Sequence, residues 1–398
     1  MLPVKKSRGA CNLPTADQFA MKILFLDQSG KPGGAELCLL DIAKHYRDRC
    51  LVALFADGTF REQLEANQIP VQVLTTQAIN VRKGSNMLQG FIGLGQLAPV
   101  IVKTVQLARS FDVIYANTQK ALVVGAIAHF VTHRPLVYHL HDILSADHFS
   151  STNQRLIVYL ANHFTKLVIA NSKASAESFI QAGGDPKKVE IIYNGFSPEL
   201  YQNHLSEVPK LRQELGSAQQ FVVGHFSRLS PWKGQHILLE ALQHCPANVV
   251  AWFVGDALFG ETAYKQQLQQ QVEDLGLGDR VRFLGFRLDV PQLMAACDLV
   301  AHTSTAPEPF GRVIVEAMLC GTPIVASAAG GVTELIEPGQ TGWLTPPGEA
   351  HKLAEIIHQC LADPDRARAI AQAAQTSASQ RFHLDAVNQQ IDRVLQGI

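Results

Sequence analysis

The chain contains 398 residues, of which 47% are hydrophobic, and it carries a formal net charge of −1. This length is typical of two domains with separate cores, and the near-neutral balance argues against a nucleic-acid partner. Lys and Arg outnumber Asp and Glu by 20 to 15 in residues 1–200, whereas the counts are 14 and 20 in residues 201–398. The basic first half is compatible with an anionic membrane surface or acceptor.

The seven cysteines are scattered singly, without a C-x-x-C pair. This usage favours free thiols in a reducing cytosol over disulfides or structural zinc. Residues 1–20 are polar and lack the apolar segment of a signal peptide, so we interpret them as a disordered N-terminal extension. The chain has no run of about 20 uninterrupted apolar residues. We therefore expect a cytoplasmic protein without a transmembrane helix.

Strand and helix patterns alternate through residues 21–200, beginning with an apolar strand at residues 22–27. Repeated βα units predict a parallel sheet covered by helices on both faces, with ligands at the carboxyl ends of the strands. Gly33 and Gly34 follow the first strand. Glycines allow a backbone to approach a phosphate or sugar closely, although glycine turns are also common without a ligand. The segment does not match the dinucleotide pattern G-x-G-x-x-G.

A later strand of this half ends in His139, His141 and Asp142. Strand alternation places both histidines on one face. The residues alone leave three interpretations open: a hydrogen-bonded structural histidine, a pair of metal ligands, or a substrate contact. A metal is disfavoured because no third ligand is close in sequence.

The segment Met87–Val102 is apolar, but three glycines and Pro99 interrupt it, so we do not expect one regular helix in its first half. One interpretation is a loop and helix packed into the first core. The other is a partly exposed apolar flap beside basic residues such as Arg82 and Lys103. Such a flap would suit shallow insertion among anionic headgroups.

Residues 201–218 are polar and are predicted to link the two domains. After the next apolar strand, Arg228 and Lys233 lie five residues apart in a loop that leads into a helix. An Arg fork and a Lys point charge suit a diphosphate. Two solvated surface charges are the alternative.

The most informative segment runs from Asp298 to Glu337, where a buried strand leads through a proline-containing loop into a helix. Glu308 lies in the loop and Glu316 in the helix. The helix begins beside residues 310–312, Phe310, Gly311 and Arg312, whose free N–H groups favour an anion. A buried Glu316 needs a hydrogen-bonding partner, which a ribose diol or the protein itself would supply.

The sequence E-P-F-G-x-x-x-x-E, followed by A-M-x-x-G-x-P-I-V-A-S and G-G-x-x-E-L-I, resembles the donor-site signature of family 4 glycosyltransferases. This resemblance implies an α/β protein of the GT-B fold, with two Rossmann-like βαβ domains facing each other across a cleft. The expected boundaries are residues 21–200 for the acceptor domain and 219–382 for the donor domain. Residues 383–398 would form a helix that returns to the first domain.

The resemblance also implies transfer of a sugar from a nucleoside diphosphate sugar, a UDP- or GDP-sugar, to a hydroxyl acceptor with retention of configuration. Gly33 and Gly34 match the GGAE loop of the family, and S-R-L-x-x-x-K-G matches its diphosphate motif. The family usually has an aspartate near Gly195, where this chain has Phe196. The resemblance implies that His141 and Glu308 contact the donor sugar and that Glu316 contacts the ribose. It implies that the diphosphate is bound by Arg228, Lys233 and the helix start at Phe310, Gly311 and Arg312. The base would be bound by the backbone of Gly285, Phe286 and Arg287.

No metal and no cofactor are expected. Asp363-Pro364-Asp365 has the form of a D-x-D metal motif, but Asp before Pro at a helix start is ordinary capping. The resemblance implies an acceptor in a polysaccharide, glycolipid or other glycoconjugate, and peripheral contact with the inner membrane face through the first domain. Two other classes stay open: an epimerase or phosphorylase on the same scaffold, and a non-catalytic nucleotide-sugar-binding module.

Overall fold

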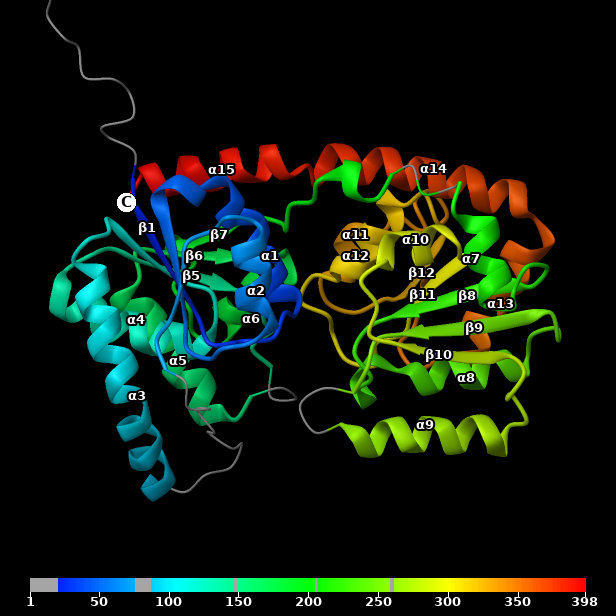
Figure 1. Ribbon diagram of the computed structural model, residues 1–398, viewed down its shortest axis with the longest axis horizontal. Coiled ribbons are helices and arrows are strands. Elements are labelled where there is room, and N and C mark those ends of the chain that lie inside the picture. Colours follow the sequence, from blue (N-terminus) through cyan, green and yellow to red (C-terminus); the bar gives the residue numbers. More distant parts are fainter. Residues whose placement is uncertain (1–20, 76–86, 146–148, 203, 205, 258–260) are drawn as a thin grey trace, which may run out of the picture.

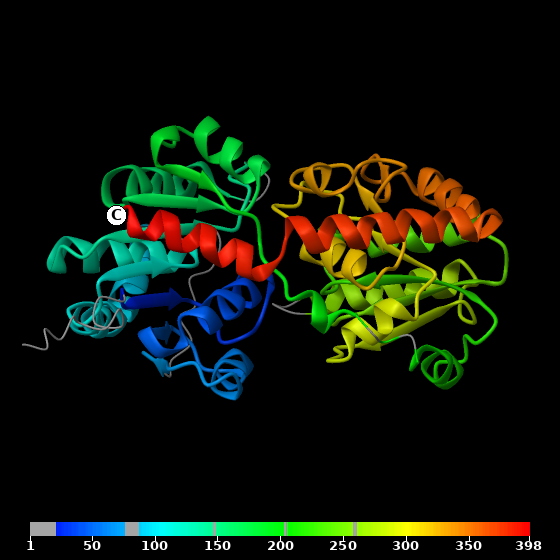
Figure 2. The same cartoon turned by 90° about the horizontal axis from the view of Figure 1, so that it is seen from above.

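The structure is a computed structural model that describes residues 21–75, 87–145, 149–202, 204, 206–257 and 261–398. It consists of two α/β domains side by side, with the C-terminal helices running across both (Figures 1 and 2). The N-terminal extension expected at residues 1–20 lies outside the described residues.

The first domain is built on a parallel sheet of seven strands in the order β3-β2-β1-β4-β5-β6-β7. Its interior strand β1 is buried at every position, because helices cover both faces of the sheet. The strands are β1 (Ile23–Asp27), β2 (Cys50–Leu54), β3 (Val71–Val73), β4 (Val113–Ala116), β5 (Leu136–Leu140), β6 (Leu167–Ala170) and β7 (Val189–Ile191).

Six α-helices belong to this domain among the described residues: α1 (Gly34–His45), α2 (Thr59–Ala66), α3 (Met87–Ala108), α4 (Gln119–Thr132), α5 (Ser151–Phe164) and α6 (Lys173–Gln181). Helix α3 corrects one prediction, since it runs unbroken through the segment in which we did not expect a regular helix. Each glycine lowers helix stability by only about 1 kcal/mol relative to alanine. The prediction therefore gave the glycines of this segment too much weight. None of the described helices combines the length and apolar character needed to cross a bilayer.

The second domain contains a six-stranded parallel sheet in the order β10-β9-β8-β11-β12-β13. Two apolar clusters cover its faces. The strands are β8 (Phe221–Phe226), β9 (Val249–Val254), β10 (Val281–Gly285), β11 (Leu299–His302), β12 (Ile324–Ser327) and β13 (Trp343–Thr345). The helices are α8 (Gln235–Gln243), α9 (Thr262–Asp274), α10 (Val290–Ala295), α11 (Arg312–Leu319), α12 (Val332–Leu335), α13 (Ala350–Ala362) and α14 (Pro364–Arg381).

The segment expected as a linker contains a short helix, α7 (Val208–Glu214). Val208 and Leu211 pack against the second core, so part of this segment belongs to the second domain. The last helix, α15 (Leu384–Gln396), returns to the first domain (Figure 1). Its residues Val387, Ile391 and Leu395 join the core that covers α1.

Loops after the strands of both sheets meet between the domains. Glu334, on α12, accepts hydrogen bonds from the backbone N–H groups of Lys173 and Ala174 at 2.9 Å each, at the start of α6. The Tyr193 hydroxyl donates to the same carboxylate. A carboxylate at a helix N-terminus is stabilised by the free N–H groups and the helix dipole. Glu334 therefore ties the second domain to the first.

Replacing a buried side chain of α15 tests its attachment to the first domain. We expect Ile391→Ala to lower the free energy of unfolding by about 2 to 4 kcal/mol, because it leaves a cavity between α15 and the first core. Circular dichroism during urea titration should show the loss. The exposed control Gln390→Ala should behave like the wild type. An unchanged midpoint for Ile391→Ala would contradict this packing.

Candidate functional site

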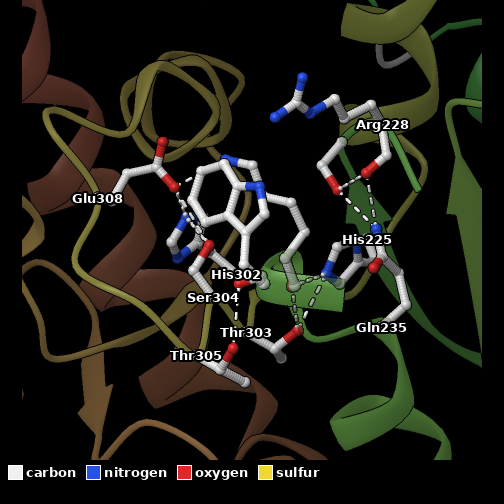
Figure 3. A network of polar contacts seen from close by, with 11 residues as sticks. His225, Arg228, Gln235, His302, Thr303, Ser304, Thr305 and Glu308 are labelled. Carbon is white, nitrogen blue, oxygen red and sulfur yellow. Dashed lines mark hydrogen bonds and ion pairs between the residues drawn. The ribbon is translucent and has the colours of Figure 1, made fainter. Parts of the chain in front are cut away.

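The loop between β8 and α8 carries the two cations that were predicted to bind a diphosphate. Gly234 ends this loop with φ +69°, and a Cβ there would lie 2.0 Å from the Thr303 carbonyl oxygen. Only glycine permits this approach. The loop after β8 is thereby pressed against the loop after β11, which carries Glu308 (Figure 3).

Lys233 and Glu308 form an ion pair in which Nζ lies 2.7 Å from Oε2. The same carboxylate oxygen lies 3.1 Å from the Ser304 hydroxyl and 3.2 Å from His302 Nε2 (Figure 3). Burial alone would raise the pKa of the Glu308 carboxyl, but the nearby Lys233 ammonium and the hydrogen bond from His302 hold this pKa well below its usual range. Glu308 is therefore an ionised acceptor at neutral pH.

The indole ring of Trp232 lies near both cations of the loop. Lys233 Nζ is 4.0 Å from the centroid of the indole ring, and Arg228 Cζ is 5.8 Å from it. An indole face attracts cations and restricts where their side chains can lie. Both positive charges are therefore held in one small region, beside the loop that carries Glu308.

Helix α11 begins where the sequence predicted an anion site. Gly311 precedes it with φ +94°, and the first N–H groups of a helix have no partner within it. The side chain of Arg312 points to the first domain, with its Nη2 atom 3.1 Å from Asp41 Oδ2 of α1. Its guanidinium also lies 4.5 Å from the Phe196 ring centroid. The backbone of Arg312 thus belongs to the start of α11, while its side chain bridges the two domains.

Glu316 finds a partner within the protein. Its Oε1 atom lies 3.5 Å from Arg312 Nε, one helical turn earlier. Burial raises the pKa of the Glu316 carboxyl, and the guanidinium opposes that rise. A ribose is therefore not required to explain this buried carboxylate, and the ribose contact stays a prediction.

The glycine loop of the first domain lies against the second domain. A Cβ on Gly34 would be 3.8 Å from Arg312 Cδ. The Gly33 N–H group donates a hydrogen bond of 2.9 Å to Glu36 Oε2 at the start of α1. Burial raises the pKa of the Glu36 carboxyl to about 8, with a further contribution from the nearby Asp27 carboxylate.

His141 lies at the same interface. Its Nε2 atom is 2.9 Å from Asn117 Oδ1, and burial together with the Arg312 charge lowers its pKa to about 3. His139 is a buried structural histidine, whose Nδ1 atom is 2.8 Å from the Tyr115 hydroxyl oxygen. Ligand atoms of Cys38, His139 and His141 lie within 4.8 Å of one another. The described residues supply no fourth ligand, and the Cys38 thiol donates to Asn194, so we assign no metal here.

The residues predicted to read the base lie at the end of β10, and Gly285 accepts a backbone hydrogen bond from Gly255. Phe286 is 67% exposed. The Arg287 guanidinium pairs with Asp289, so its side chain is occupied within the protein. Farther away, Asp363 caps α14 by accepting from the backbone N–H of Arg366, as the capping interpretation predicted.

Several residues of the site were not singled out from the sequence. His302 and Ser304 stand at the end of the recognised strand segment and Trp232 stands between Arg228 and Lys233, but no pattern gave them a role. Glu334 stands inside the quoted G-G-x-x-E-L-I pattern, which was the available signal. Asn117 and Asp41 gave no local signal.

Two family models together match most of the chain. Residues 32–200 match Glycosyltransferase Family 4, and residues 207–377 match Glycosyl transferases group 1. The D-inositol 3-phosphate glycosyltransferase of Mycobacteroides abscessus is 32% identical over 201 residues, which are 49% of this chain and 44% of that protein. The N-acetyl-alpha-D-glucosaminyl L-malate synthase of Bacillus anthracis is 28% identical, over 52% of this chain and 53% of that protein. The chain thus spans about half the length of these curated relatives.

Solved structures give a match over 95% of the chain. The Anabaena protein Alr3699/HepE, crystallised with UDP-glucose, is 62% identical, with a TM-score of 0.89 over 95% of this chain and 100% of that one. The same protein was also solved with UDP and glucose. A sucrose-phosphate synthase from Thermosynechococcus elongatus, 19% identical with a TM-score of 0.81 over 95% of this chain and 99% of that one, shares the fold. The chain therefore belongs to the family 4, group 1 glycosyltransferases and has their two-domain GT-B architecture.

Proposed function

We propose that this glycosyltransferase moves a hexose from a nucleoside diphosphate sugar to a hydroxyl acceptor with retention of configuration, and that UDP-glucose is its donor. The choice of donor is supported by the 62% identical HepE, whose structures contain UDP-glucose or UDP. A GDP-sugar is the alternative that a donor screen would test.

The observation that carries this proposal is the ion pair between Lys233 and Glu308. In a nucleoside diphosphate sugar, anionic phosphate oxygens lie next to sugar hydroxyls, because the phosphate is bonded to the anomeric carbon. A cation and a carboxylate held 2.7 Å apart match that neighbourhood. Lys233 would bind phosphate oxygens and Glu308 would accept from a sugar hydroxyl.

The same arrangement suits departure of the diphosphate. Arg228, Lys233 and the N–H groups that start α11 would stabilise the negative charge that builds on the leaving oxygen. In other transferases a divalent cation neutralises the leaving diphosphate. Here these protein charges would do so, and we therefore propose that no metal is needed. His141 and the loop at Gly33 and Gly34 would close the site from the first domain.

A front-face reaction fits the environment of Glu308. This carboxylate is held by Lys233 and His302, which makes it a poor nucleophile for a glycosyl-enzyme intermediate. In the reaction we propose, the bond from the anomeric carbon to the phosphate oxygen breaks, and the acceptor oxygen bonds to that carbon on the same face. The departing phosphate oxygen takes the proton of the acceptor hydroxyl.

The acceptor that we propose is a glycan or lipid-linked hydroxyl, reached by peripheral contact of the first domain with an anionic membrane. The predicted flap falls largely outside the described residues, because residues 76–86 and the side chains of 87–96 are not described. Among the described residues, neighbouring helices α3 and α4 expose Val102, Phe130 and Val131 by 55%, 70% and 49%. These apolar side chains support the membrane proposal.

Removing the diphosphate-binding cations tests the donor site. We expect Arg228→Ala and Lys233→Ala each to lower the rate of glucose transfer from UDP-glucose by roughly 100-fold, or on the order of 3 kcal/mol of transition-state stabilisation. Mass spectrometry of the product with soluble and lipid-linked acceptors gives the rates. Lys352→Ala, which breaks an exposed ion pair on the same domain, is the control. Wild-type turnover in both site variants would refute the assignment.

Liposome co-sedimentation tests the membrane proposal. We expect anionic vesicles to retain the protein at low salt, because apolar side chains and nearby cations act together. Phe130→Glu combined with Val131→Glu should release it, since these side chains are exposed on α4. Leu288→Glu changes an exposed apolar side chain of the second domain and should leave retention unaltered. If the wild type ignores anionic vesicles at every salt concentration, a soluble acceptor becomes the better proposal.

A further inference from the structure

A chain of hydrogen bonds connects His141 to the buried end of β1. Asn117, directly after β4, donates through Nδ2 to Asp27 Oδ2 at 2.7 Å and to the Ala35 carbonyl oxygen at 3.1 Å. A carbonyl oxygen can only accept, so the amide of Asn117 must direct its NH₂ group toward Asp27 and Ala35. Its carbonyl oxygen is then the atom that lies 2.9 Å from His141 Nε2.

This orientation determines where His141 carries its proton. Burial lowers the pKa of His141 to about 3, and the Arg312 charge adds to the effect, so the ring is neutral at neutral pH. A neutral imidazole has one N–H group. Because Asn117 Oδ1 can only accept, that N–H group is at Nε2. The other nitrogen, Nδ1, is left as an acceptor with no hydrogen-bond partner among the described residues.

The charged and titratable groups around His141 agree with a neutral ring. Burial raises the pKa of Asp27, opposed by the hydrogen bond that its carboxyl oxygen accepts from the Asn117 amide. The Asp142 carboxylate accepts from Gln119 instead of from His141. Among the described residues, the groups near the ring include His139 on β5, Cys38 on α1, Arg312 on α11, and Asp27 beyond Asn117.

We propose that Asp27 and Asn117 are positioning residues, which hold His141 as the tautomer whose Nδ1 accepts a hydrogen bond from a hydroxyl of the donor sugar. This inference rests on the proposed function, because the sugar hydroxyl is the donor that Nδ1 requires. Asp27 orients the amide of Asn117, and Asn117 in turn orients the imidazole. Neither residue touches the sugar.

The tautomer can be measured in the free protein. Long-range ¹H–¹⁵N NMR of the full chain with labelled histidine reports which nitrogen is protonated, and the signal missing from His141→Gln assigns the ring. We expect protonation at Nε2 in the wild type and a mixture of tautomers in Asn117→Ala. The matched control is Asn171→Ala, because Asn171 directly follows β6 of the same sheet, is 3% exposed and does not contact the chain of hydrogen bonds. Its His141 signal should match the wild type.

The pH dependence of transfer supplies a second readout. We expect the wild-type kcat/KM with UDP-glucose to show no titration of His141 between pH 5 and 9. In Asn117→Asp, a carboxylate faces Nε2 and favours the imidazolium, which has no acceptor at Nδ1. The rate should then fall by about tenfold per pH unit below the raised pKa. Asp27→Asn, which preserves volume, should produce a tautomer mixture and lower kcat more than it raises KM.

The outcomes separate the two proposals. Protonation at Nδ1 in the wild type, or an Asn117→Asp variant that folds and keeps the wild-type pH profile, would overturn the positioning role even if glucose transfer is efficient. If no nucleotide sugar is turned over, the proposed function fails. The NMR signals of the free protein would then still decide how Asp27 and Asn117 hold His141.

Discussion

The ion pair between Lys233 and Glu308 is the interaction on which the site depends. It joins a loop that follows β8 to a loop that follows β11, and its two atoms lie 2.7 Å apart. The pair requires Gly234, because any side chain there would collide with the Thr303 backbone. A buried carboxylate without this cation would be costly, so the pair stabilises Glu308 in its loop.

The second constraint is that neither domain forms the site alone. Arg312 begins a helix of the second domain, yet its guanidinium pairs with Asp41 of the first and adds to the lowering of the His141 pKa by burial. Glu334 fixes the start of α6 through two backbone N–H groups. Helix α15, which follows the second domain in the chain, packs into the core of the first domain. Together these contacts hold His141 of the first domain beside Arg312 of the second.

Sequence patterns predicted both sheets, because apolar strands and glycine-ended helices leave local signals. The family resemblance singled out Arg228, Lys233 and Glu308, and the structure brings Lys233 and Glu308 together. The sequence patterns could not reveal that Arg312 pairs with Asp41, 271 positions away, or that Asn117 pairs with Asp27, 90 positions away. Such partners are set by tertiary packing. For the same reason the sequence could not show which partner Glu316 has, and the structure places Arg312 beside it.

The central claim is that Lys233 recognises the phosphate and Glu308 recognises the sugar. Its most direct test is calorimetry, which measures the binding of UDP and of UDP-glucose to Lys233→Met, to Glu308→Gln and to the double variant. Lys233→Met should weaken both ligands. Glu308→Gln should weaken UDP-glucose yet bind UDP at least as tightly as the wild type, because it frees the lysine. The double variant should lose less UDP-glucose affinity than the sum of the single losses. Equal weakening of UDP by both single variants would contradict the claim.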